Sequence, residues 1–484
     1  MRPSLENGAI IGQPLAAKAG MEALARGANA VDAAVTAALV AGVVALPSTG
    51  IGGYGGAMVI ALASGKVTAI DFNTEAPKNA PEKPYFHGWL AAGVPGILAG
   101  LELALHRYGT LTLRQALEPA MRYASEGIPI PAAMAAAIRS NQRLKEDAAS
   151  AALYFPVKET MRNPDLARML GTLAKENSCE PFYRGAIGRE IARQFAEHGG
   201  RVTAEDLGAY EALEAPALAI EFGGCRIHTA PLAAGGATVL QALASLRGLK
   251  YDGAAWDHAR LEALRLAWQD RLSLFGDPRF TKVPMERLLA GEGSKRIARA
   301  VAAKRALELP ERKASGGGTI HLSAADRQGN MVALTLTHGE SFGACVTVPG
   351  LGMTLGHGMS RFEDAAGHPN AIGPRKRPLH NMCPTVVMRN GKPVLAVGAT
   401  GGRRIPNSVF DVLARMLVEG RGLKDAVAAP RMNTAGGLEV ALNKAWGEEA
   451  AGQFRGLGFS VKTEAAAIVQ AVGLESSGFV TAAG

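Results

Sequence analysis

Two residues between Gly316 and Gly343 have surroundings suited to nucleophilic chemistry. Thr319 directly follows three glycines and begins an alternating stretch, TIHLSA, typical of a strand. Ser341 lies in GESFG, which fits the G-x-S-x-G pattern of a nucleophile elbow. An elbow serine needs a helix after it, whereas the residues that follow here, ACVTVPG, predict a short strand and a turn. The sequence therefore favours Thr319, and Ser341 is interpreted as an exposed serine on a glycine loop.

A threonine at a newly formed N-terminus carries its own base. Its α-amine, with an ordinary pKa of about 7.7 to 8.0, stands beside the hydroxyl that it must deprotonate. The glycines before Thr319 permit the strained backbone that an N-to-O acyl shift requires. Under this hypothesis the chain cuts itself between Gly318 and Thr319. The alternative is that Thr319 is an ordinary β-branched residue at a strand start.

The elements that must position Thr319 change in character at a polar connector, LPERKASGGG, over residues 309–318. The sequence before it is mostly helical in pattern, with a strand hairpin predicted over 57–72. The sequence after it predicts strands over 319–324 and 331–337, joined by the turn residues DRQGN. The connector thus divides a helix-rich half from a half that begins with strands.

A second glycine pattern, Gly50-x-Gly52-x-x-Gly55, fits the dinucleotide-binding fingerprint. That motif must leave a strand and enter a helix. Here it leaves a predicted helix and enters a predicted strand, so a tight glycine turn is the favoured interpretation. No cofactor is predicted.

Composition excludes several other classes of function. The 484 residues carry a net charge of +9 without any long basic block, so binding to nucleic acid is not expected. The four cysteines form no C-x-x-C pair, which predicts neither a zinc site nor a redox motif, and no metal is expected. Scattered cysteines and an N-terminus without a signal-peptide pattern predict a cytoplasmic protein.

The apolar run AVDAAVTAALVAGVVALP, residues 30–47, is interpreted as a buried helix capped near Asn29. Its residues are mostly small and weakly hydrophobic, and Asp32 lies near its start. A membrane span is therefore not predicted.

The chain resembles the γ-glutamyltranspeptidase family of N-terminal-nucleophile hydrolases along nearly its full length. In the first half the likeness rests on NAVDAAVTAALVAGVVALPSTGIGGYGGAMVI, GVPGILAGLELALHRYGTLTL and FYRGAIGREIARQFAEHGGRVTAEDLGAYEA. In the second half it rests on TIHLSAADRQGNMVALTLT, RPLHNMCPTVVMRNGKPVLAVGATGGRRI and AAPRMN. The order and spacing of these segments agree with the family.

The resemblance implies an α+β fold, the αββα sandwich, made as a self-cleaving precursor. The products would be a helix-rich large subunit, residues 1–318, and a small subunit, residues 319–484, which stay folded together, alone or as a dimer of such units. Thr319 would be the nucleophile, and Thr337 on the neighbouring strand would help to activate it.

The resemblance also places the oxyanion hole at the backbone amides of Gly401 and Gly402. These glycines precede a helix predicted from Ile405 to Glu419. Exposed N–H groups and the helix dipole both favour a developing negative charge at such a place.

The residues with which the family grips a γ-glutamyl group are mostly absent. The positions that correspond to that clamp are Asn73, Gly339, Gly358, Arg361, His380 and Asn381. Asn73 replaces the arginine that grips the α-carboxylate, and Arg361 replaces an aspartate that meets the α-ammonium. Two positive charges at 4 Å repel by about 4 kcal/mol at an intermediate dielectric, so a free α-amino group is expected to bind badly.

The sequence therefore predicts a self-processing amide hydrolase that acts through an acyl-enzyme on a small, carboxylate-bearing amide. An oxamate-like compound or a dicarboxylic monoamide fits, with Arg361, His380 and Asn381 holding the carboxylate. Two points stay open at this stage. Arg361 is either a pocket residue or an outward residue on a shifted lid loop, and His380 is either a pocket residue or a structural hydrogen-bonding group. The alternative functions are a true γ-glutamyltransferase and an unprocessed, non-catalytic binding protein.

Overall fold

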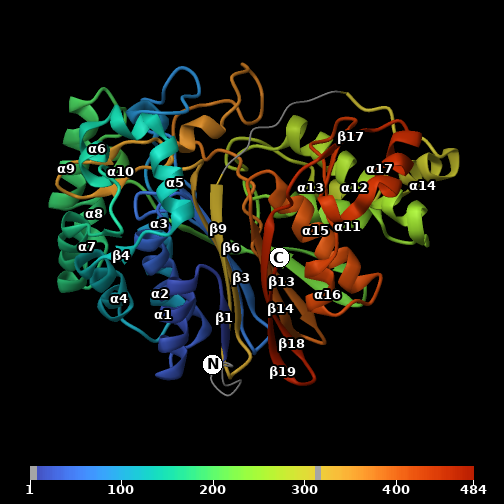
Figure 1. Ribbon diagram of the computed structural model, residues 1–484, viewed down its shortest axis with the longest axis horizontal. Helices are drawn as coiled ribbons and strands as arrows, with labels where there is room; N and C mark the ends of the chain where they lie inside the picture. The colour runs from blue at the N-terminus through green and yellow to red at the C-terminus, as the bar shows by residue number, and fades with distance from the viewer. Residues whose placement is uncertain (1–7, 311–317) are drawn as a thin grey trace.

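Two antiparallel sheets of six strands lie face to face at the centre of the molecule, and helices cover the outer face of each (Figure 1). The computed structural model describes residues 8–310 and 318–484, so most of the predicted connector lies outside the described residues. The first sheet has the order β1-β9-β10-β2-β3-β6 and the second β19-β18-β14-β13-β8-β7. This is the αββα layering that the resemblance predicted.

The strands of the first sheet are, in sheet order, β1 (Ala9–Ile11), β9 (Gly318–Ala325), β10 (Met331–Gly339), β2 (Gly55–Ala61), β3 (Val67–Asp71) and β6 (Leu213–Pro216). Those of the second are β19 (Gly478–Ala483), β18 (Ile468–Glu475), β14 (Lys392–Thr400), β13 (Thr385–Arg389), β8 (Cys225–Thr229) and β7 (Leu218–Phe222). Two short strand pairs form separately, β4 (Ile128–Pro129) with β5 (Thr160–Met161) and β11 (Thr347–Val348) with β12 (Met353–Thr354). A small three-stranded sheet consists of β15 (Met432–Asn433), β16 (Glu439–Leu442) and β17 (Ser460–Thr463).

The helices divide into two groups by the sheet that they cover (Figure 1). On the first sheet's side are α1 (Pro14–Ala25), α2 (Ala30–Val44), α3 (Ile97–Tyr108), α4 (Leu113–Glu126), α5 (Ala132–Ser140), α6 (Ala148–Tyr154), α7 (Pro164–Glu176), α8 (Glu180–Tyr183), α9 (Ala186–Glu197) and α10 (Ala204–Gly208). On the second sheet's side are α11 (Gly236–Ser245), α12 (Gly253–Leu274), α13 (Met285–Leu289), α14 (Gly293–Ala303), α15 (Arg404–Leu417), α16 (Leu423–Ala428) and α17 (Gly447–Gly456).

Helix α2 shows how the sequence produces this packing. Asn29 caps its first turn by accepting hydrogen bonds from two backbone amides, and Asp32 completes the capping box. Every residue of α2 is buried, and its alanines and valines allow close contact with β9 and β10. The apolar run is thus a core helix, as predicted. Within residues 8–310 and 318–484, no helix is long and apolar enough to cross a membrane.

Small side chains fill the space between the two sheets. This inner core includes Ala57, Ala69, Ala333 and Ala396, together with Val472 and other apolar residues. The side chains are short, so the strands of one sheet lie close above those of the other, and β9 packs against β14. The close packing brings the start of β9 near the end of β14.

The predicted division into a helical half and a strand-led half is only partial. Strands β1, β2, β3 and β6 of the first sheet precede the connector, as do β7 and β8 of the second. Each sheet therefore combines strands from both sides of the connector. Backbone hydrogen bonds between strands, which local sequence patterns do not specify, decide this pairing.

Candidate active site

Thr319 and Thr337 lie on neighbouring strands and meet through their hydroxyl groups. Strands β9 and β10 pair in antiparallel fashion up to Leu336 and Ile320, where the register shifts. Beyond the shift, Thr319 Oγ1 donates a hydrogen bond to Thr337 Oγ1 at 3.3 Å. The backbone amide of Gly339 donates to the same Thr337 oxygen at 2.7 Å. Both threonines are buried, and the structure brings them together as the sequence predicted.

The glycine pair lies at the junction of β14 and α15. Gly401 has a φ of 143° and Gly402 a φ of 61°, a region that favours glycine. Arg404 and Ile405 begin α15 by donating backbone hydrogen bonds to the carbonyls of Gly401 and Gly402. The pair thus precedes the N-terminus of a fourteen-residue helix, at the end of the strand that packs against β9.

Gly398 makes room for a buried side chain of β9. A Cβ at Gly398 would lie 2.3 Å from His321 Cε1, so no larger residue fits there without a shift. The His321 ring contacts the hydroxyls of Thr335 at 2.8 Å and Ser323 at 2.9 Å. Burial lowers the pKa of His321 to about 3, so its ring is neutral. These contacts fix β9 between its neighbouring strand and the opposite sheet.

Arg361 is half-buried and lies against the ring of His357. Its Nη2 lies 3.2 Å from Nε2 of His357, a fully buried ring. A Cβ at Gly339 would lie 2.0 Å from the His357 ring and 3.1 Å from the Tyr54 ring, so both rings pack on the glycine that bonds Thr337. Arg361 thus lies against a buried ring, and its role in holding the substrate stays a prediction.

Tyr54 is under the electrostatic influence of two arginines, Arg361 and Arg271. Burial raises the pKa of its phenol, while the positive charges of Arg361 and Arg271, together with a hydrogen bond from Arg361, oppose that rise. Tyr54 belongs to the glycine turn IGGYGG between α2 and β2, where Gly52 bridges to Leu355. The turn is thus a tight chain reversal in the order helix then strand, and it carries a site residue.

His380 and Asn381 are held by Arg271 of α12. Nη2 of Arg271 donates to the His380 carbonyl at 2.8 Å and to Asn381 Oδ1 at 3.2 Å. The His380 side chain is 2% exposed, and within the described part of the chain neither ring nitrogen has a hydrogen-bond partner. Burial lowers its pKa to about 3, assisted by the charges of Arg271, Arg377 and Arg361. The ring is therefore neutral and makes no hydrogen bond to the described residues, and its role in the pocket stays a prediction.

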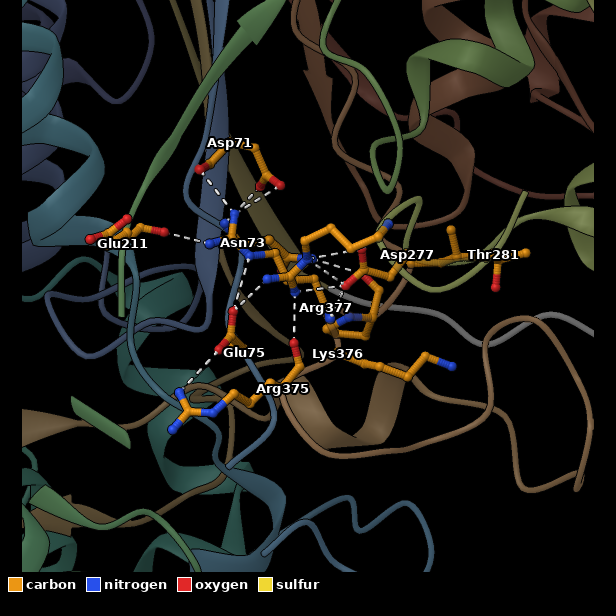
Figure 2. A network of polar contacts seen from close by, with 12 residues as sticks. Asp71, Asn73, Glu75, Glu211, Asp277, Thr281, Arg375, Lys376 and Arg377 are labelled. Carbon is orange, nitrogen blue, oxygen red and sulfur yellow. Dashed lines mark hydrogen bonds and ion pairs between the residues drawn. The ribbon is translucent and has the colours of Figure 1, made fainter. Parts of the chain in front are cut away.

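Asn73 lies in a polar network beside this segment (Figure 2). The residue is fully buried, and its Nδ2 donates to the Pro378 carbonyl at 2.7 Å. Its backbone amide donates to Asp71 Oδ1, and Arg377 Nη1 donates to Asp71 Oδ2 at 3.0 Å. The backbone amide of Arg377 in turn donates to Asp277 Oδ2. Asn73 therefore ties the end of β3 to the segment that carries His380.

The other sequence candidates lie elsewhere. Ser341 is exposed in a turn, and no helix follows it, in agreement with its interpretation as a loop serine. All four cysteines are buried and free. Among the described residues, no group of three or more His, Cys, Asp or Glu side chains is arranged to hold a metal ion.

Sequence reasoning missed three residues of the site: Tyr54, His357 and Arg271. The sequence did offer a signal for Tyr54, because glycines on both sides of an aromatic residue allow other backbone segments to approach it closely. His357 also stands between glycines, in LGHGM. Arg271 carries no local signal, because it is one charged residue on a long helix.

The sandwich of two antiparallel sheets between helical layers, with a threonine at the start of a central strand, is that of N-terminal-nucleophile hydrolases. Residues 16–484 match the family described as Gamma-glutamyltranspeptidase, and the chain belongs to this family. A glutathione hydrolase proenzyme of Pseudomonas sp. (strain A14) is 33% identical over 470 residues, covering 88% of this chain and 81% of the relative.

Other relatives carry a different activity in their names. The acylase ACY 1 proenzyme of Pseudomonas sp. (strain SE83) is 33% identical over 471 residues, covering 89% of this chain and 82% of the relative. The crystal structure of cephalosporin acylase from Bacillus halodurans superposes with a TM-score of 0.91 at 27% identity, over 99% of this chain and 94% of that one. The relatives are thus named as a hydrolase and as acylases, which supports an amidohydrolase of the γ-glutamyltranspeptidase family.

Proposed function

We propose that this protein is a self-processing threonine amidohydrolase that acts on a small amide bearing a carboxylate. The observation that carries the proposal is the contact between Thr319 and Thr337 at 3.3 Å, beside a glycine on which Tyr54 and His357 pack. The relatives named proenzymes support processing, and the positive charge of Arg361 next to this contact supports the acidic substrate.

Processing would begin with attack of Thr319 Oγ1 on the carbonyl carbon of Gly318. The acyl group moves from nitrogen to oxygen, which leaves an ester on Thr319 and frees its α-amine. Water then hydrolyses the ester and releases the Gly318 carboxylate. The products are residues 1–318 and 319–484, a small chain of 166 residues because 484 − 318 = 166. Thr337 would orient the attacking hydroxyl.

Amide hydrolysis would use the same oxygen after processing. The free α-amine of Thr319 takes the hydroxyl proton as Oγ1 attacks the substrate carbonyl, and the proton passes to the leaving amine. The backbone amides of Gly401 and Gly402 would stabilise the oxyanion. Water then hydrolyses the acyl-enzyme. A histidine base needs a pKa near 7. Burial lowers the pKa of His338 and His380 to about 3, so neither ring suits the role of base.

The substrate would be an oxamate-like compound or a dicarboxylic monoamide. Arg361 would hold its carboxylate, with His380 and Asn381 as neighbouring polar groups. Asn73, whose side-chain amide donates to the Pro378 carbonyl, would position the segment that carries His380 and Asn381. The relatives named glutathione hydrolase make that activity the alternative, and the positive charge of Arg361 argues against a substrate with a free α-amino group.

Purification and gel electrophoresis test the first part of this proposal. The wild type is expected to separate into two chains under denaturing conditions, and the smaller should begin Thr319-Ile320-His321. Thr319→Ala should stay at the full 50.2 kDa and should be inactive. The matched control is Ser341→Ala, which should be processed and active because Ser341 is exposed in a turn. A different N-terminus would refute Thr319 as the nucleophile, and an uncut wild type would favour the binding protein.

A further inference from the structure

Arg271 is a buried guanidinium group without a carboxylate partner in the described part of the chain. Its side chain lies within α12 and is 3% exposed. Nη2 is engaged by His380 and Asn381, but Nη1 has no hydrogen-bond partner among the described residues. Burial of a charge is costly unless it is paired and hydrogen-bonded. The fold therefore retains a buried positive group that forms no ion pair with a carboxylate among the described residues.

Three other buried arginines of this protein each have a carboxylate partner. The pairs are Arg260 with Asp411, Arg265 with Glu262, and Arg377 with Asp71. Arg265 lies on the same helix as Arg271, and its partner is 2.8 Å away. Burial lowers the pKa of Arg271 to about 10, and the groups that oppose this shift are Cys383 and Tyr54, both neutral at neutral pH. Its environment thus lacks the carboxylate that stabilises these three.

The unpaired guanidinium lies beside the proposed active site. Tyr54 feels the charges of both Arg271 and Arg361, and so does the ring of His380. Tyr54 packs on Gly339, whose amide bonds Thr337. Arg361 is connected to the threonine pair by direct contacts through His357 and Gly339. Arg271 directly contacts His380 and Asn381, two residues predicted to bind the substrate.

We propose that Arg271 is a second ligand of the substrate carboxylate, which would lie between Arg271 and Arg361 with Asn381 at its edge. This inference rests on the proposed function. Arg271 supplies hydrogen-bond donors whose fork matches a carboxylate. On the Arg361 side, His357 and Gly339 lie between this anion site and Thr337, so a short substrate would place its carboxylate near the scissile carbonyl. The substrate class is accordingly the short monoamides of dicarboxylic acids.

The test compares an acidic amide with its neutral counterpart. The probes are oxamate, malonamate and succinamate, each paired with the corresponding diamide. In Arg271→Gln, KM for the preferred acidic amide should rise about 10- to 100-fold, the scale of a lost hydrogen bond to a charged group. KM for the diamide should change less than threefold, and kcat and self-cleavage should be retained. Arg271→Lys keeps the charge but loses the fork, so its KM should be intermediate.

Arg265→Gln is the matched control, because it removes a buried arginine from the same helix. It should lower the melting temperature without changing the ratio of the two KM values. Should Arg271→Gln fail to fold, wild-type enzyme titrated with malonate and malonamide still tests the anion site: malonate should inhibit at least ten times more strongly. Equal inhibition, or an equal effect of Arg271→Gln on both amides, would overturn this inference. Failure of the proposed function would instead appear as an uncut or inactive wild type.

Discussion

At the scale of single residues, the site differs from a γ-glutamyl clamp in where its positive charge lies. Asn73, at the position of the family's arginine, is neutral and uses its amide on the Pro378 carbonyl. Arg361, at the position of an aspartate, lies against His357 and Tyr54 beside the threonine pair. The positive charge therefore lies at the position of Arg361, whereas the family's clamp has it at the position of Asn73. Under the proposed function, a substrate would present its carboxylate in a different direction and would need no ammonium group.

Arg361→Asp tests this reversal. The substitution places a negative charge where the carboxylate is proposed to bind, so KM for the acidic amide should rise by about 100-fold or more. Self-cleavage should be unchanged, because it needs Thr319 and its close neighbours rather than the substrate site. Steady-state kinetics and gel analysis of the same preparation measure both. Unchanged kinetics on every active substrate, or efficient hydrolysis of glutathione by the wild type, would contradict the reversed clamp.

At the scale of elements, one strand pairing and one contact between the two sheets build the proposed active site. The pairing of β9 with β10 brings the two threonines together, and the register shift after Leu336 lets the Gly339 amide reach Thr337. The packing of β14 on β9 then brings the end of β14, with its glycine pair, toward the same end of the molecule. Helix α15 begins there, so its dipole favours negative charge at that point.

Gly402→Val should lower kcat by about 100-fold or more, the usual scale for loss of one oxyanion donor. A β-branched residue at a φ of 61° distorts the turn, and the amides no longer point at the oxyanion. Gly420→Val is the matched control, because Gly420 follows α15 at its other end with a φ of 70° and has open space where a Cβ would lie. That variant should keep its kcat. Near-normal turnover of Gly402→Val at saturating substrate would place the oxyanion hole elsewhere.

At the scale of the whole molecule, the cut at Thr319 would not separate two domains. Both sheets contain strands from before and after the connector, and the inner core combines Ala57 and Ala69 with Ala333 and Ala396. Each product would expose unpaired strand edges and apolar faces if it were isolated. Processing therefore releases an N-terminus without dividing the core.

The two chains should consequently co-elute as one particle after processing. Apolar contacts and strand pairing hold them, so 1 M NaCl, which screens surface charges, should not separate them. Size-exclusion chromatography followed by denaturing gels measures this, and residues 319–484 expressed alone should be insoluble or unfolded. Elution of two separate folded chains would refute the single-core interpretation.

The sequence by itself determined the features that depend on neighbours along the chain. Alternation and turn residues predict β9 and β10, the glycines single out Thr319, and the composition of residues 30–47 predicts a capped core helix. These patterns are local, because propensity, capping and turn chemistry act within a few residues. The register shift after Leu336 and the mixing of strands from both halves could not be predicted, since pairing depends on contacts between distant segments.

The tertiary structure alone decided which charges face the site. Arg271 and Asn381 are 110 positions apart, and Arg377 meets Asp71 across 306 positions. Whether a buried arginine is paired with a carboxylate, as Arg377 is, or left for a ligand, as we propose for Arg271, depends on such contacts and on burial. Local sequence contains neither, because both arginines are simply charged residues within their segments. The sequence therefore predicts a candidate nucleophile, whereas the proposed anion site could be recognised only from the fold.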